Sequence, residues 1–97
     1  MSATFELIDK EIIPTLNFPK SDVLDDKEAL AERKNHLDRA LSLGNLEHVK
    51  IKIYFEDNQS KKVVEAKVCG VTKNRVILTQ GIGIPINRIY RTFKFYN

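Results

Sequence analysis

The chain has 97 residues, of which 42% are apolar and 30% are charged. That size suits one domain with one core, and the composition is that of a globular protein rather than a disordered one. No apolar run approaches the roughly 20 residues that a membrane helix needs, and residues 1–6 lack the basic and apolar segments of a secretory signal. The single cysteine, Cys69, has no partner for an internal disulfide. We therefore expect a cytoplasmic protein with no membrane partner.

Charge is distributed unevenly along the chain. Residues 1–44 carry six Lys/Arg and nine Asp/Glu, whereas residues 45–97 carry ten Lys/Arg and four Asp/Glu. The two parts have net charges of −3 and +6, which together give the formal net charge of +3. A basic second half is attracted to phosphate polymers or to acidic partners. The alternative is that its Lys and Arg only solvate a small sheet and protect its edges.

Residues 1–24 form an apolar N-terminal arm. Apolar residues from Phe5 to Ile13 recur at helical spacing, which predicts a short amphipathic helix that ends at Pro14. Residues 15–20 show no periodicity, which is typical of an extended connection. Because the arm carries much apolar surface for a free tail, we expect it to pack either on the core or on another copy of the protein.

The segment 25–44 predicts a helix over residues 26–43. Asp25 is the expected N-cap, and Glu28 completes a capping-box pattern. The body is rich in helix formers, and its leucines form one apolar stripe that should cover a face of the sheet. Gly44 is expected to take the left-handed position that ends many helices. The leucines of the stripe are Leu30, Leu37 and Leu41.

From residue 48 onward the apolar period changes to two, which predicts β-strands. Residues 57–60 have the composition of a turn, and a four-residue loop there fixes the register of the two flanking strands. That one register separates an apolar inner face from a mostly polar outer face. The expected inner pairs are Ile53–Val64, Ile51–Ala66 and Val49–Val68, and the expected outer pairs are Tyr54–Val63, Lys52–Glu65 and Lys50–Lys67.

Gly70 interrupts the alternation, and a bulge or sharp bend there would restore the inward face of the later strands. Glycines in the segment 80–83 are free to take positive φ, which favours a turn. The expected later elements are a turn at 73–74, a strand at 76–78, a turn at 80–83, a short strand and tight turn over 84–89, and a last strand over 91–95.

These elements predict a single α+β domain, 1–97, in which the helix packs on a five-stranded, strongly bent antiparallel meander or small barrel. Residues 84–89 read Ile-Pro-Ile-x-x-Ile, and with the meander of 48–96 they resemble the SH3-like and Sm-like small β-barrels. Residues 77–84 are similar to the second Sm motif, although Gln80 replaces its Arg and the Asp and Asn of the first motif have no counterpart. The resemblance therefore implies the fold but not RNA-binding residues. The whole chain also resembles small uncharacterised bacterial proteins, which implies no function.

No arrangement of residues indicates catalysis or a cofactor. His36 and His48 lack a Cys or a second His at the spacing of a zinc site. The register places Cys69 opposite His48, but an activated thiolate also needs an orienting group and an oxyanion site, so a half-buried structural cysteine is the simpler interpretation. Gly81 and Gly83 lack the other parts of a phosphate-binding loop. We therefore expect no enzyme, no metal, no cofactor and no small-molecule substrate.

The outer face of the predicted sheet is the candidate working surface. It combines basic side chains with an aromatic ring, which is typical of surfaces that bind nucleic acid without sequence preference. Glu65 opposite Lys52 partly neutralises it. The candidate residues, including those that flank the turns, are Lys50, Lys52, Tyr54, Lys67, Lys73, Arg75, Arg88 and Arg91.

Two functions remain open at this point. The preferred hypothesis is a non-enzymatic interaction module that binds itself, as a homo-oligomer, or binds a protein partner. The apolar arm and the exposed strand edges support it. The alternative is sequence-tolerant RNA or DNA binding by the basic outer face.

Overall fold

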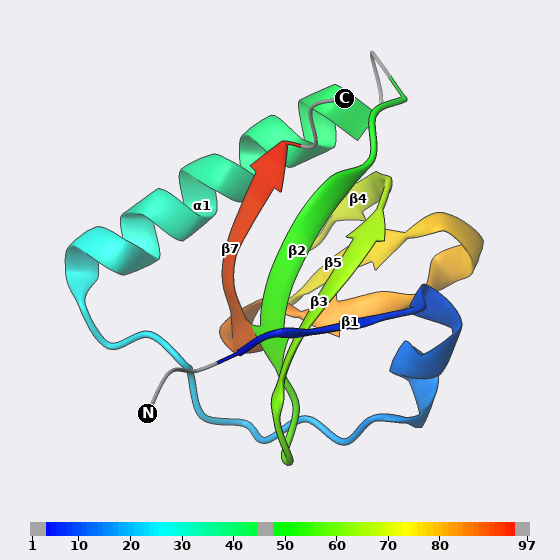
Figure 1. Cartoon of the computed structure of the whole chain (residues 1–97). Helices are drawn as coiled ribbons and strands as arrows, with labels where there is room; N and C mark the ends of the chain where they lie inside the picture. Colours follow the sequence, from blue (N-terminus) through cyan, green and yellow to red (C-terminus); the bar gives the residue numbers. More distant parts are fainter. Residues whose placement is uncertain (1–3, 45–47, 95–97) are drawn as a thin grey trace.

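A computed structural model of the chain describes residues 4–44 and 48–94 and shows an α+β fold, as predicted. Helix α1 spans Lys27–Ser42 and lies beside β7 (Figure 1). The first sheet has the strand order β1-β3-β2-β7, and the second has the order β4-β5-β6. The strands are β1 (Glu6–Ile8), β2 (Ile51–Glu56), β3 (Lys61–Ala66), β4 (Val68–Val71), β5 (Arg75–Leu78), β6 (Gly83–Pro85) and β7 (Ile89–Lys94). Short 3₁₀ helices are η1 (Lys10–Thr15), η3 (Thr79–Gly81) and η4 (Ile86–Arg88).

The described strands form two sheets, whereas the sequence predicted one five-stranded meander or a small barrel. Strand β3 passes into β4 at Lys67, and the pairing partner changes there from β2 to β5. Strand β7 then returns to pair with β2 at the far side of the first sheet. No closed ring of strand pairing is present among the residues that the structure describes.

The register of the β2–β3 hairpin is the predicted one over its whole ladder, from Ile51–Ala66 to Glu56–Lys61. Beyond Ala66 the prediction is wrong, because the chain bends into the second sheet and Val68 pairs with Leu78. The pairs that the β2–β3 ladder does not contain are Val49–Val68 and Lys50–Lys67.

The turn between β2 and β3 is organised by Asp57, which is buried. Its Oδ1 atom accepts hydrogen bonds from the backbone N–H groups of Gln59 and Ser60, at 3.1 and 2.9 Å, and from Lys62 Nζ at 3.0 Å. Burial opposes ionisation of Asp57, but these donors outweigh it, so the pKa of this carboxyl lies below its usual value. The ionised side chain thereby fixes the loop that sets the register.

The bend predicted at Gly70 is confirmed as an irregularity of the β4–β5 ladder between Val68 and Gly70. The turn at 73–74 is confirmed too, since the Thr72 N–H donates to the carbonyl of Arg75 at 2.8 Å. The next turn forms at η3, where positive φ occurs at Gln80 and Gly81. These turns join β4 to β5 and β5 to β6 within the second sheet.

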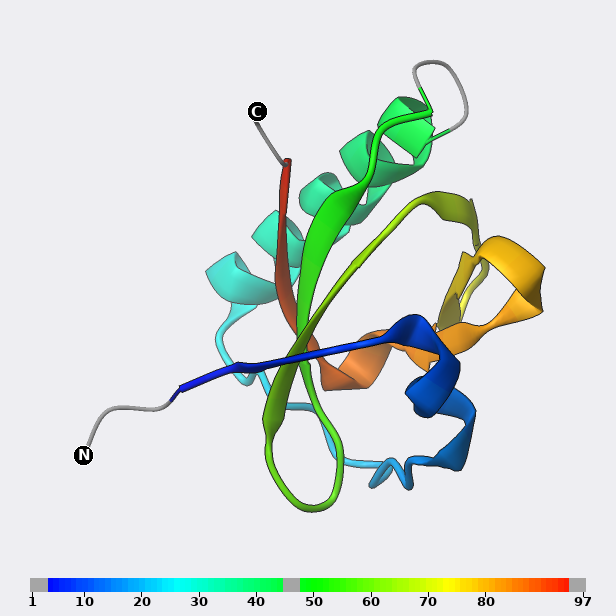
Figure 2. The ribbon, with the colours of Figure 1, turned by 45° about the vertical axis from the view of Figure 1, so that its right-hand side comes forward.

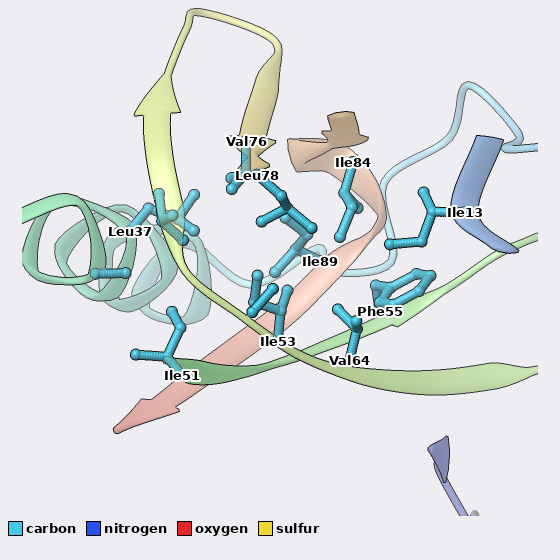
Figure 3. Packing of buried hydrophobic residues seen from close by; sticks show 13 residues of the cluster. Ile13, Leu37, Ile51, Ile53, Phe55, Val64, Val76, Leu78, Ile84 and Ile89 are labelled. Carbon is cyan, nitrogen blue, oxygen red and sulfur yellow. The ribbon is translucent and has the colours of Figure 1, made fainter. Parts of the chain in front are cut away.

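The core lies between the two sheets, because alternate side chains of each strand point to the same side. Figure 3 shows side chains of β2 meeting those of the second sheet. Leu37 of α1 closes one end of this core and Ile13 of η1 closes the other. The largest fully buried side chains are Phe55, Ile13, Ile51, Ile53, Leu78, Ile84, Ile89, Val64, Val68 and Val76.

The helix predicted for the N-terminal arm is wrong. Strand β1 pairs in parallel with the edge of β3, with Leu7 opposite Val63, and η1 follows it (Figure 2). The exposed edge of β3 offers unpaired backbone groups, and a strand satisfies them where a helix cannot. The arm therefore packs on its own chain, and Ile13 is only 1% exposed.

The ends of α1 differ from the prediction in two details. Asp26 rather than Asp25 is the N-cap, and its carboxylate accepts the N–H of Ala29 at 3.3 Å. Gly44 is not in the left-handed region. A Cβ atom on Gly44 would lie 2.0 Å from the carbonyl oxygen of Val68, so glycine is required here for the close approach of the chain to β4.

Candidate functional site

Four aromatic rings gather on the outer face of the first sheet, away from the core. Tyr54 of β2 meets Phe5 edge to face, with ring centroids 5.0 Å apart, and meets Phe93 of β7 in the same way at 5.7 Å. Phe5 also contacts Tyr90 at 5.6 Å. We call this surface, made of Phe5, Tyr54, Tyr90 and Phe93, the aromatic face. It arises because even-numbered residues of β2 point outward while Ile53 and Phe55 are buried.

Two cations lie over the rings of the aromatic face. The Arg91 guanidinium is 5.3 Å from the ring centroids of both Tyr54 and Phe93. Lys61 Nζ is 5.7 Å from the ring of Phe5 and 5.3 Å from that of Tyr90. Cations within about 6 Å of a ring centroid are attracted to it. The positive charge of this surface is therefore held in place by the rings.

Tyr90 is tied to an acidic neighbour on β2. Its hydroxyl donates a hydrogen bond to a carboxylate oxygen of Glu56. Burial, together with this hydrogen bond and the charge of Glu56, raises the pKa of Tyr90 to about 12. The phenol therefore stays neutral and remains a donor at neutral pH.

Apolar surface is exposed at both edges of the first sheet. Phe93 is 48% exposed and Leu7, on β1, is 63% exposed. Tyr54 lies between them and is half-buried by its ring contacts. The face thus offers rings, an aliphatic side chain and cations on one side of one sheet.

Of the sequence-predicted site residues, Lys52, Tyr54 and Arg91 come together on this face through the β2–β7 register. Lys50 lies at its margin, beside a hollow of about 260 Å³ that Glu65 also lines. Lys67 is directed elsewhere, with its Nζ 3.1 Å from Nδ1 of His48.

Cys69 does not pair with His48 as the sequence register predicted, because β4 has turned away into the second sheet. His48 lies instead beside Lys67. The thiol is exposed rather than half-buried. The predicted Cys–His adjacency is therefore wrong.

Arg88 is not a surface residue, which corrects its place among the candidates. It is 7% exposed. Its Nε donates to the backbone carbonyl of Glu56 at 3.0 Å, and its Nη1 donates to the carbonyl of Ser21 at 2.9 Å. The guanidinium is therefore occupied by hydrogen bonds that connect η4 to other parts of the chain.

Arg88 belongs to a group that sequence reasoning missed, which we call the connector clamp: Arg33, Asp22, Asn87 and Arg88. Both carboxylate oxygens of Asp22 accept from Arg33 at 2.8 Å, and Arg33 also donates to the carbonyl of Ile89 at 3.0 Å. Burial opposes ionisation of Asp22, but Arg33 and the Leu24 N–H outweigh it and lower the pKa of this carboxyl.

Asn87 completes the clamp from η4. Its Nδ2 lies within hydrogen-bond distance of the carbonyls of Pro19, Lys20 and Ser21, at 3.3, 2.7 and 3.0 Å. These partners are 66 to 68 residues away in sequence, so no local pattern could reveal them. The one available signal was Arg33, which lies at helical spacing within the leucine stripe of α1.

Lys73 and Arg75 lie in a different place from the aromatic face. Both line a hollow of about 850 Å³ between the second sheet and the connection that follows η1. Lys20 of that connection and Pro85 of β6 line it as well. The predicted basic residues are therefore split between two surfaces.

The described ranges, 4–44 and 48–94, contain no cluster of three His, Cys, Asp or Glu side chains that could hold a metal ion. Within the same ranges, no helix has the length and apolar character needed to cross a membrane. Comparisons with protein-family models, with curated proteins and with solved structures gave no match.

Proposed function

We propose that the chain is a non-enzymatic interaction module of the cytoplasm that binds a second copy of itself through the aromatic face. The observation that supports this most is the exposure of Leu7 and Phe93 on the same face of one sheet. Aromatic and arginine side chains are enriched at the centres of protein interfaces and supply most of their binding energy. Tyr54 and Arg91, which are in contact on this face, have that character.

The charges of the face suit a copy of itself. A two-fold interface places the same patch against itself, so a stable patch must carry groups that complement each other. The outer side of the first sheet carries Lys61 and Arg91 as well as Glu56 and Glu65. Opposite charges can therefore meet when two such faces turn toward each other.

The proposal also includes a more specific description of the fold. We infer that the two sheets are the halves of a small barrel of the SH3-like or Sm-like kind. The continuous passage of β3 into β4, the tight turn η4 before β7 and the return of β7 to β2 all support it. In that arrangement the aromatic face lies on the outside of the barrel wall.

Sedimentation velocity at micromolar concentration tests the self-association. The wild-type chain is expected to dimerise, and Leu7→Ser with Phe93→Ser is expected to weaken the dimer by about 30-fold, the effect of losing a hot spot of about 2 kcal/mol. Ile12→Ser is the matched control, since Ile12 is 43% exposed but lies on η1. A wild-type monomer, or an equal loss in the control, would contradict the proposal. Deleting the arm is not a usable test, because Ile13 belongs to the core.

The second candidate function is binding of single-stranded nucleic acid by the same face. The interleaving of Lys61 and Arg91 with the rings favours it, because such surfaces attract the backbone and stack on bases. Fluorescence anisotropy of a labelled single-stranded RNA, measured at several salt concentrations, tests it. If this function is right, affinity falls steeply with salt and falls again with Arg91→Glu. Affinity that is undetectable at low salt would remove this candidate.

A further inference from the structure

The hollow beside the second sheet is large enough to hold a small molecule. Its volume of about 850 Å³ lies in the range of typical ligand pockets, roughly 300–1,000 Å³. One wall comes from η1 and the connection after it, and the other comes from β6 and η4. The apolar side chains that line it include Leu16, Phe18, Pro19, Pro85 and Ile86.

Three cations at this hollow have no partner to neutralise them. Lys20, Lys73 and Arg75 are exposed, and their side chains make no hydrogen bond or ion pair with any residue within 4–44 and 48–94. Asp22 also lines the hollow, but both of its carboxylate oxygens are bound by Arg33. The described lining therefore carries an uncompensated positive charge beside an apolar surface.

The guanidinium of Arg75 lies close to the backbone of Gly83, where a larger residue would leave no room for it. A Cβ atom on Gly83 would lie 2.6 Å from Nη2, 2.8 Å from Cζ and 2.8 Å from Nε of Arg75. The guanidinium therefore occupies the space that a side chain at position 83 would take. Gly83 does not have positive φ, so its backbone conformation does not require glycine. Its missing side chain is what gives the guanidinium this position.

The wall formed by the connection after η1 is held by hydrogen bonds before any ligand arrives. Asn87 binds the carbonyls of residues 19–21, and Arg33 binds Asp22 immediately after them. The Val23 N–H donates in addition to the carbonyl of Asn87 at 2.9 Å. A preformed wall lowers the entropy that binding must overcome.

We propose that this hollow binds an organic phosphate, that is, a phosphate group carried on an apolar or aromatic body. A phosphate monoester carries a charge of about −1.5 to −2 at pH 7. It therefore neutralises a cluster of cations more completely than a carboxylate ligand, which carries a single negative charge. The planar guanidinium of Arg75 can donate two parallel hydrogen bonds to phosphate oxygens. The apolar lining would hold the body, which an inorganic ion lacks. This site is separate from the aromatic face and does not depend on the function proposed for that face.

Isothermal titration calorimetry with phenyl phosphate tests the proposal, with phenylacetate and inorganic phosphate as the comparison probes. Phenyl phosphate is expected to bind at least tenfold more tightly than either. Arg75→Gln is expected to weaken it at least tenfold. Gly83→Ala keeps every charge but displaces the guanidinium, so it should weaken binding to a similar degree. Lys34→Gln, which removes an exposed lysine of α1 outside the hollow, is the matched control and should change nothing.

Each other outcome overturns the proposal. Equal affinity for phenylacetate would show a general anion surface, and equal affinity for inorganic phosphate would show that the apolar lining takes no part. Unchanged binding in Arg75→Gln would place the ligand elsewhere. No heat with phenyl phosphate at millimolar concentration would mean that the hollow is not a phosphate site. A thermal melt of each variant verifies folding, and Lys73→Gln replaces Gly83→Ala if that variant unfolds.

Discussion

Arg75 precedes the short strand β6 in the chain and Arg88 follows it, and the surroundings of the two side chains are opposite. Arg88 is buried, and its guanidinium donates to the carbonyls of Glu56 and Ser21. Arg75 is exposed on the backbone of Gly83 and has no side-chain partner among the described residues. The same contrast separates the connector clamp from the hollow next to it. Every charged side chain of the clamp forms hydrogen bonds within the chain, whereas the exposed cations of the hollow form none with the described residues, so stability should depend on the clamp and ligand binding on the hollow.

The largest expected effect comes from breaking the clamp at Arg88. Arg88→Met should destabilise the fold by about 2–3 kcal/mol, because the charge-assisted hydrogen bonds from the buried guanidinium to the carbonyls of Glu56 and Ser21 are lost. Arg75→Met, the same change at the hollow, should alter stability by less than about 0.5 kcal/mol. Urea denaturation of both variants measures the difference. Equal destabilisation by the two changes would contradict the contrast between them.

A smaller effect is expected at Asp22, and it depends on pH. The pKa of this carboxyl is lowered in the folded chain, so the unfolded chain binds its proton more tightly. The stabilisation by Asp22 is therefore complete above its ordinary pKa of 3.8 and is lost as the pH falls below that value. Asp22→Asn should cost about 1.5 kcal/mol at pH 6 and much less at pH 2.

Urea denaturation at the two pH values checks the Asp22 prediction. The Asp22→Asn variant still contains Asp57, whose pKa is also lowered in the folded chain. Its stability should therefore depend less on pH than that of wild type, but should still fall in acid. A cost for Asp22→Asn that is the same at pH 6 and pH 2 would show that the ion pair with Arg33 does not stabilise the clamp.

The smallest effect is expected at Tyr90, which connects the aromatic face to the clamp through Glu56. Its pKa is raised to about 12, so the folded chain holds the phenolic proton more tightly than the unfolded chain, whose phenols titrate near 10. The resulting stabilisation is present below pH 10 and is lost as the pH rises toward 12. Ultraviolet titration should show a phenol that titrates near pH 12 in wild type and is missing from Tyr90→Phe. Glu56→Gln should bring that titration to lower pH, and no change would exclude Glu56 as a cause.

The register of β2 and β3 was predictable because one alignment makes both strands amphipathic at once, from Ile51–Ala66 onward. The same alternation brought Lys52 and Tyr54 to one face. The arm was not predictable, since its apolar spacing fits a helix and the edge of β3 that decides its structure is more than 50 residues away in sequence. Arg88 was wrongly predicted to lie on the surface, because its partner Ser21 is 67 residues away in sequence. The alternation of apolar and polar residues thus shows which side chains share a face of a sheet. It does not show which basic side chains form hydrogen bonds with residues far away in the sequence.

The most direct test of the contrast between paired and unpaired arginines is the ¹H–¹⁵N spectrum of the arginine Nε–H groups during titration with phenyl phosphate. The Nε–H of Arg88 is bound to the carbonyl of Glu56, so its signal should exchange slowly with water and stay unchanged. The signal of Arg75 should exchange rapidly in the free protein and shift as phenyl phosphate binds. A shift of Arg88, or a shift of Arg91 with none at Arg75, would contradict the account.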